Sequence, residues 1–87
     1  MQIIYSPIFL RQYRKLESDI QRQAESKEKV FRRNPFDERL RTHKLHGKLS
    51  DLWAFSVNSK VRIVFEFAED HSVTFHVIGT HDIYEER

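Results

Sequence analysis

The chain has 87 residues, which is enough for one small domain over residues 1–87 and leaves no room for a second core. It contains no cysteine, which excludes disulfides, thiolate catalysis and cysteine-based zinc sites. No apolar run approaches the ~20 residues of a membrane-spanning helix, so we expect a soluble, cytoplasmic protein.

The formal net charge of +2 conceals an uneven distribution along the chain. Residues 27–48 hold eight Lys or Arg and three acids, whereas residues 63–87 hold one Arg and six acids. A basic segment of this kind suits a polyanion such as nucleic acid, and an ordinary mixed-charge surface is the alternative.

The N-terminal part of the chain predicts a strand followed by two helices. Residues 3–5 are a short β-prone run, and Ser6–Pro7 is a typical helix start, with serine as the N-cap. Apolar residues at spacings of three and four then predict a helix of about five turns with one buried face: Phe9, Tyr13, Leu16, Ile20 and Ala24. A second, shorter helix is predicted at residues 28–33, ended by Asn34–Pro35.

The second half of the chain predicts strands. Residues 39–45 alternate as a polar strand or extended loop would. Residues 52–67 predict a hairpin that turns at 58–59, because apolar side chains alternate along both arms. A last strand is predicted with Val73, Phe75 and Val77 facing inward. The order β-α-α-β-β-β predicts an α+β fold, in which two N-terminal helices cover one face of a small antiparallel sheet.

The residues that could carry chemistry do not form a metal site. His43 and His46 are three residues apart, which on an extended segment places them on opposite faces. We therefore expect neither a metal nor another cofactor.

The chemistry that remains is cleavage of RNA by its own 2′-hydroxyl, which needs proton transfer and stabilisation of the phosphate charge. Arg62 projects from a central strand and suits a phosphate, while a histidine such as His81 suits proton transfer near neutral pH. Tyr84 suits stacking on a base or assistance to proton transfer. Arg62 also has an ordinary explanation as a surface ion-pair residue, and His81 as a solvated side chain.

Four segments, taken in order, resemble the RelE/ParE superfamily of toxins from type II toxin–antitoxin pairs, in particular its YoeB/YafQ-like branch. They are the helix at 9–16, the segment 34–47 with its Asn-Pro-Phe-Asp and Thr-His-Lys-Leu-His-Gly motifs, the hairpin 53–67, and the Ile-Gly-Thr-His-Asp motif at 78–82. The resemblance covers nearly the whole chain. It implies a RelE-like fold and a metal-independent endoribonuclease that cuts messenger RNA on the ribosome and is inhibited by a cognate antitoxin.

The resemblance also implies roles for individual residues. Arg62 corresponds to the arginine that stabilises the scissile phosphate, His81 to a proton-transfer histidine, and His43 to a histidine near the phosphate. Tyr84 corresponds to a terminal aromatic residue, although it stands one position closer to the histidine than in many relatives. The predicted RNA contacts are Arg41, Lys44, Lys48 and Lys60.

Some positions depart from the pattern and keep alternatives open. Ala54 and Ser56 stand where some relatives carry an acid or a histidine, and Lys60 stands where some carry an acid. One alternative is a ParE-like toxin that inhibits DNA gyrase. Others are a catalytically inactive binding protein with the RelE fold, or a small interaction domain whose apolar groove receives a partner helix.

Overall fold

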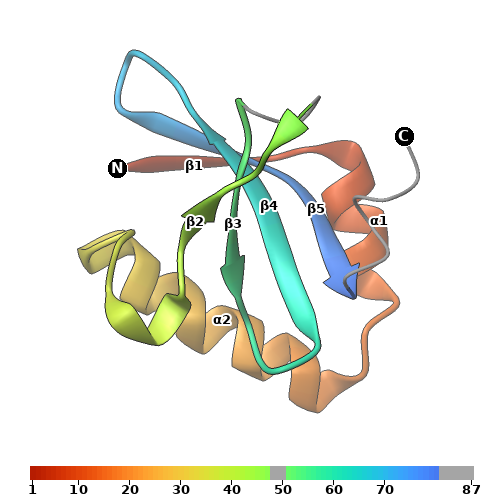
Figure 1. Cartoon of the computed structure of the whole chain (residues 1–87). Coiled ribbons are helices and arrows are strands. Elements are labelled where there is room, and N and C mark those ends of the chain that lie inside the picture. Colours follow the sequence, from red (N-terminus) through yellow and green to blue (C-terminus); the bar gives the residue numbers. More distant parts are fainter. Residues whose placement is uncertain (48–50, 81–87) are drawn as a thin grey trace.

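The computed structural model describes residues 1–47 and 51–80 (Figure 1). The elements in chain order are β1 (Gln2–Tyr5), α1 (Pro7–Arg14), α2 (Ser18–Arg33), the 3-10 helix η1 (Glu38–Leu40), β2 (His43–Lys44), β3 (Trp53–Ser56), β4 (Val61–Phe67) and β5 (Ser72–Thr80). The strands form one five-stranded sheet in the order β1-β5-β4-β3-β2. The predicted α+β class and the predicted order of elements are confirmed, and the segment 39–45 contributes a short extra strand.

The sheet is mixed rather than wholly antiparallel. Strands β2 to β5 pair antiparallel as predicted, but β1 pairs parallel with β5, with Ile3 opposite Val73 and Tyr5 opposite Phe75. Parallel pairing requires a long crossover, which the two helices and the rest of the sheet supply here. The order of elements alone does not reveal which edge of the sheet the first strand joins.

The break between the helices lies earlier than predicted. Helix α1 ends at Arg14, the amides of Lys15 and Leu16 bond to carbonyls three residues back, and Glu17 is extended. Helix α2 then runs without interruption through residues 25–26, so the predicted five-turn first helix is wrong. Apolar residues before and after this break pack on the same core, so their spacing in the sequence does not reveal where the first helix ends.

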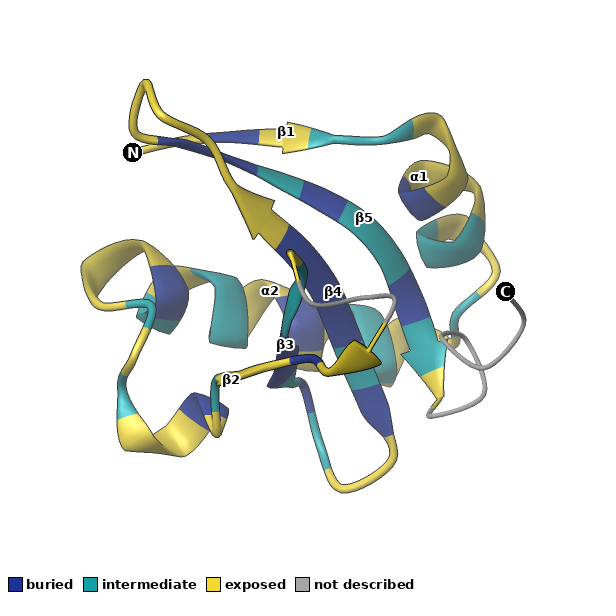
Figure 2. Ribbon diagram, turned by 45° about the horizontal axis from the view of Figure 1, so that its top comes forward, coloured by how far each residue is buried: buried dark blue, intermediate teal, exposed yellow. Residues whose placement is uncertain are grey.

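Both helices cover one face of the sheet, where the aromatic core lies. Phe31 of α2 is fully buried, and its ring centroid lies 4.9 Å from those of Phe55 and Phe65 and 5.5 Å from that of Phe75. Figure 2 shows the buried residues concentrated along β4 and β5. The predicted helix-on-sheet layering is confirmed. None of the helices in the described part of the chain is long and apolar enough to cross a membrane.

A β-bulge between β4 and β5 changes the face on which two residues lie. Val64 pairs with Val77 and Phe65 pairs with Phe75, which leaves His76 as the extra residue. The bulge reverses the alternation, so Ile78 enters the aromatic core and Val77 lies on the opposite face. The prediction that Val77 faces inward is therefore wrong.

The face of the sheet opposite the helices, here called the outer face, carries a second, smaller apolar cluster. Leu45, Ala54 and Val64 form a small buried cluster there, with Leu52 and Val77 packed against it. The alternation along β3 and β4 places the polar side chains of Ser56 and Arg62 on this same face, nearer the hairpin turn.

The predicted N-cap of the first helix is confirmed, and its contribution to the free energy of unfolding can be measured. The Ser6 hydroxyl accepts a hydrogen bond from the Phe9 amide at 2.9 Å and donates one to the His76 carbonyl at 2.7 Å. We expect Ser6→Ala to lower the free energy of unfolding by about 1 kcal/mol, measured by urea denaturation. Ser18→Ala is the matched control, because Ser18 makes no side-chain hydrogen bond within the described residues. Equal stabilities of the two variants would contradict the cap assignment.

Candidate nucleic-acid interface

The turn between β3 and β4 is fixed by one side chain. The Asn58 Oδ1 atom accepts hydrogen bonds from the amides of Lys60 and Val61, each at 2.8 Å. Its Nδ2 atom donates to Gln23 of α2 at 2.7 Å. These bonds tie the turn to the helix layer and set the position at which β4 begins.

The edge of β3 is covered by another strand for only part of its length. Strand β2 pairs with Trp53 and Ala54 alone. Farther along the chain, just after β3, helix α2 reaches this edge, and its Lys27 ammonium donates a hydrogen bond to the Val57 carbonyl at 3.1 Å. Side chains from both faces of the sheet therefore meet at this edge.

A depression of about 360 Å³ lies at this edge, and we call it the basic depression. It is lined by Lys27, Arg39, Arg41, Ser56, Asn58, Ser59 and Arg62. Four of these side chains are cationic and the other three are neutral hydrogen-bonding groups. None of the lining residues within the described part of the chain is acidic, so the depression suits an anion.

Arg62 occupies the sheet side of the basic depression. It is half-buried and stands in register between Ser56 on β3 and Gly79 on β5. Because glycine has no side chain, Gly79 itself places no side chain beside Arg62 on β5. A planar guanidinium in such a position can donate two parallel hydrogen bonds to a phosphate.

His43 lies on the same face of the sheet as Arg62. It pairs with Ala54, which is two residues from Ser56 on the same strand, so the Cα atoms of His43 and Arg62 are two strand spacings and two residues apart, about 12 Å. The Nδ1 atom of His43 lies 3.0 Å from the Arg41 carbonyl oxygen. Since a carbonyl can only accept, Nδ1 carries the proton in this contact, and Nε2 of the neutral ring is left as an acceptor.

The structure brings together some of the predicted site residues and separates others. Arg41 and Arg62 line the basic depression, and Lys60 is exposed in the adjoining turn. Lys44 pairs with Trp53 on the helix side of the sheet, with its ammonium 5.9 Å from the indole centroid. His81, Tyr84 and Lys48 lie outside the described residues.

Two cations of the basic depression were missed at the level of individual residues. Lys27 comes from α2 and Arg39 from η1, and both belong to the basic segment 27–48. The excess of Lys and Arg in residues 27–48 therefore indicated the region from which these two cations come. It did not distinguish these two residues from the other cations of the segment, because only the tertiary structure brings them to the edge of β3.

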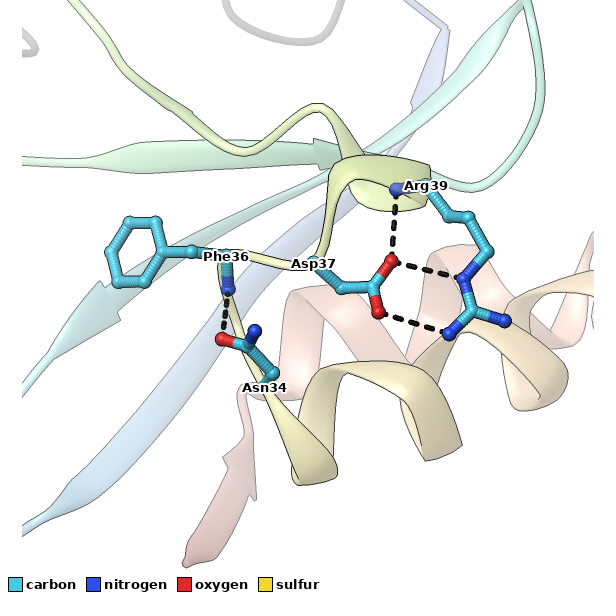
Figure 3. A network of polar contacts seen from close by, with 4 residues as sticks. All are labelled: Asn34, Phe36, Asp37 and Arg39. Carbon is cyan, nitrogen blue, oxygen red and sulfur yellow. Dashed lines mark hydrogen bonds and ion pairs between the residues drawn. The ribbon is translucent and has the colours of Figure 1, made fainter.

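Arg39 is held by the carboxylate of Asp37 (Figure 3). Its Nε atom donates to Asp37 Oδ1 and its Nη2 atom to Oδ2, both at 2.9 Å. The Arg39 amide also donates to Oδ1 at 2.9 Å, so the same carboxylate caps η1. The side-chain hydrogen bonds from Arg39, followed by its amide, lower the pKa of Asp37 to about 2.

This ion pair predicts a pH dependence of stability. The folded-state pKa of Asp37 lies below the ordinary value, so its contribution is present above about pH 4 and is lost as the pH falls towards 2. We expect Asp37→Asn to be less stable than the original chain at pH 7, and the difference to narrow at pH 2.5. Urea unfolding at the two pH values measures this difference. A difference independent of pH would contradict the assignment.

Metal ligands do not gather in the part of the chain that the structure describes. Over residues 1–47 and 51–80, no three His, Asp or Glu side chains are placed to hold a metal ion together. The described residues that line the basic depression carry ammonium, guanidinium, hydroxyl and amide groups, which can donate hydrogen bonds to an anion.

Comparison by sequence alone finds no relatives. No protein-family model matches this sequence, and no curated protein matches it significantly.

Comparison by structure identifies the fold as that of RelE-type toxins. The YoeB/ParE toxin from Agrobacterium tumefaciens superposes with a TM-score of 0.79 at 13% identity, over 93% of this chain and 99% of that one. YafQ from E. coli strain BL21(DE3) gives 0.76 at 14% identity, over 92% of each chain. A chain of the archaeal RelE-RelB complex from Pyrococcus horikoshii OT3 gives 0.76 at 13% identity, over 94% and 96%. The predicted RelE-like fold is confirmed.

Proposed function

We propose that this chain is the toxin of a type II toxin–antitoxin pair and acts as a metal-independent endoribonuclease on ribosome-bound messenger RNA. The observation that carries the proposal is the basic depression, which gathers four cationic side chains around the edge of β3. It occurs on a fold shared with YoeB, YafQ and RelE. A phosphodiester is the anion that such a set of donors suits best.

The proposed reaction is attack of an RNA 2′-hydroxyl on the adjacent phosphorus. A bond forms between O2′ and phosphorus, the bond from phosphorus to O5′ breaks, and the products are a 2′,3′-cyclic phosphate and a 5′-hydroxyl. Negative charge accumulates on the two non-bridging oxygens in the transition state. The guanidinium of Arg62 stabilises that charge, because it donates through two N–H groups at once.

Proton transfer needs a base for the 2′-hydroxyl and an acid for the leaving oxygen. His43 is the proposed base, because its contact with the Arg41 carbonyl leaves Nε2 free on the same face as Arg62. His81 is the proposed acid, and it follows Gly79, the register partner of Arg62, by two positions in the sequence. Tyr84 is the proposed stacking residue, and Lys44, Lys48 and Lys60 are proposed as further RNA contacts.

The proposed partner besides ribosome and messenger RNA is an antitoxin. Structural neighbours of this chain occur in complexes named RelE-RelB and YoeB-YefM. An antitoxin for this chain would present an acidic segment to the basic segment 27–48, and would compete with RNA where that segment lines the basic depression.

Expression of the chain alone in a bacterial host tests the proposal. We expect growth arrest together with new 5′ ends inside the translated codons of an abundant transcript, mapped by primer extension. Arrest accompanied by DNA damage and no new ends would instead support a gyrase-inhibiting toxin. A folded chain that causes neither effect would support an inactive binding protein.

A further inference from the structure

The position of Arg39 is more constrained than that of an ordinary surface arginine. Its side chain is 64% exposed, yet both of its contacts with Asp37 are 2.9 Å long and the pair is bidentate. Beyond the cap that Asp37 gives to η1, an exposed ion pair of this kind adds little to stability. What the pair does fix is the direction of the guanidinium.

The pairing leaves one side of the guanidinium available. Arginine has five side-chain N–H groups, and Asp37 accepts from two of them, one on Nε and one on Nη2. No other hydrogen bond from this guanidinium is found within residues 1–47 and 51–80. In Figure 3 the free Nη1 atom points away from Asp37. Arg39 itself lines the basic depression.

The cations of the basic depression approach it from two sides of the sheet. Arg62 comes from the outer face of β4, with Ser56 beside it. Lys27 and Arg39 come from α2 and η1, which pack on the helix side, and Lys27 crosses to the edge of β3 at Val57. One phosphodiester carries a single negative charge. Even with the Asp37 carboxylate offsetting Arg39, the other three cations exceed what one phosphate requires.

We propose that the helix side of the basic depression is a second phosphate subsite, which binds the phosphate next to the one at Arg62. Arg39 binds that phosphate, and Asp37 is the positioning residue that holds the Arg39 guanidinium towards it. This inference rests on the proposed function, because it takes the ligand to be an RNA strand. It adds two residues, Arg39 and Asp37, to which neither the sequence motifs nor the fold assigns a role.

The experiment measures binding without cleavage. The probe is a short single-stranded RNA with 2′-O-methyl groups, which lacks the attacking hydroxyl, and its dissociation constant is measured by fluorescence anisotropy over a range of salt concentrations. Each phosphate contact on a single strand contributes about 0.7 to the slope of log affinity against log salt. We expect Arg39→Ala to weaken binding several-fold and to reduce the slope by about 0.7.

The matched control is Arg33→Ala, which removes the same charge from the same basic segment. Arg33 is exposed and does not line the basic depression, so we expect its slope to equal that of the original chain. If Arg39→Ala and Arg33→Ala give the same slope, the subsite is refuted.

Asp37→Asn tests the positioning role separately. Asparagine can still accept the cap hydrogen bond from the Arg39 amide but cannot hold the guanidinium as an ion pair. We expect weaker RNA binding, with Asp37→Glu restoring part of it. Unchanged or tighter binding would show that Asp37 only competes with RNA for Arg39, and would overturn the positioning role.

Arg62→Ala separates failure of this inference from failure of the proposed function. If Arg62→Ala weakens binding and Arg39→Ala does not, only the second subsite is wrong. If neither variant weakens binding, the basic depression is not the RNA site and both proposals fail. If both weaken binding but ribosome-bound messenger RNA is never cut, the subsite stands and the proposed reaction fails.

Discussion

Arg62→Ala is expected to lower the rate of messenger-RNA cleavage by roughly 10²–10³-fold, the usual cost of removing one donor from a developing oxyanion. The side chain is half-buried on the outer face and contributes nothing to the aromatic core, so the variant should fold. Cleavage by the purified chain on ribosomes carrying a defined messenger RNA measures the rate, and a circular dichroism spectrum shows whether the variant is folded.

Two further variants sharpen this test. Arg62→Lys keeps the charge but lacks the planar fork, and we expect it to restore only part of the rate. Arg33→Ala removes an exposed charge away from the basic depression and should leave the rate nearly unchanged. Full cleavage by folded Arg62→Ala would remove Arg62 from the mechanism.

Phe31→Ala is expected to have the largest effect on stability, a loss of about 3–5 kcal/mol. Phe31 is fully buried and packs against Phe55, Phe65 and Phe75, so its removal leaves a cavity at the point where α2 meets the sheet. A small domain has a free energy of unfolding of about 5–15 kcal/mol in total, so this loss removes a large fraction of the stability, and nearly all of it if the domain lies at the lower end of that range. Urea denaturation monitored by circular dichroism measures the loss.

Phe36→Ala is the matched control for this prediction. Phe36 is 55% exposed and covers Trp53 and Phe67 at the surface, with ring centroids 5.5 and 5.9 Å away. The same chemical change there should cost much less, about 1 kcal/mol. Comparable losses in the two variants would mean that the helix layer does not pack on the sheet as described.

Alternation of apolar residues was sufficient to predict the central hairpin and the face on which Arg62 lies. Successive side chains of a strand point to opposite faces, so burial of one face fixes the face of every residue in the strand. The apolar residues of both arms of the hairpin are assigned to the same face in this way. The same reasoning failed at Val77, because the bulge at His76 inserts a residue that no pattern in Val-Thr-Phe-His-Val-Ile reveals. The helical spacing of apolar residues failed in a similar way at residues 15–17, where one helix ends and the next begins while the apolar face continues.

The candidate site was predictable only in part, for a related reason. Arg62 could be chosen from the alternation along its strand, and Arg41 from the basic segment. Lys27 is 35 positions from Arg62 in the sequence, and no local pattern links the two residues. They meet because β2 is short and leaves the edge of β3 to the helix layer. Lys44, by contrast, lies in the basic segment, yet its register with Trp53 places it on the helix side of the sheet.

The most direct test of the proposed function is the chemistry of the RNA ends that the purified chain produces on ribosomes carrying a defined messenger RNA. We predict cleavage at the codon in the A site, with a 2′,3′-cyclic phosphate on one fragment and a 5′-hydroxyl on the other. Formation of both products should slow by the same roughly 10²–10³-fold in Arg62→Ala. Fragments ending in a 3′-hydroxyl, or intact messenger RNA after incubation with the folded chain, would contradict a nuclease that uses the 2′-hydroxyl.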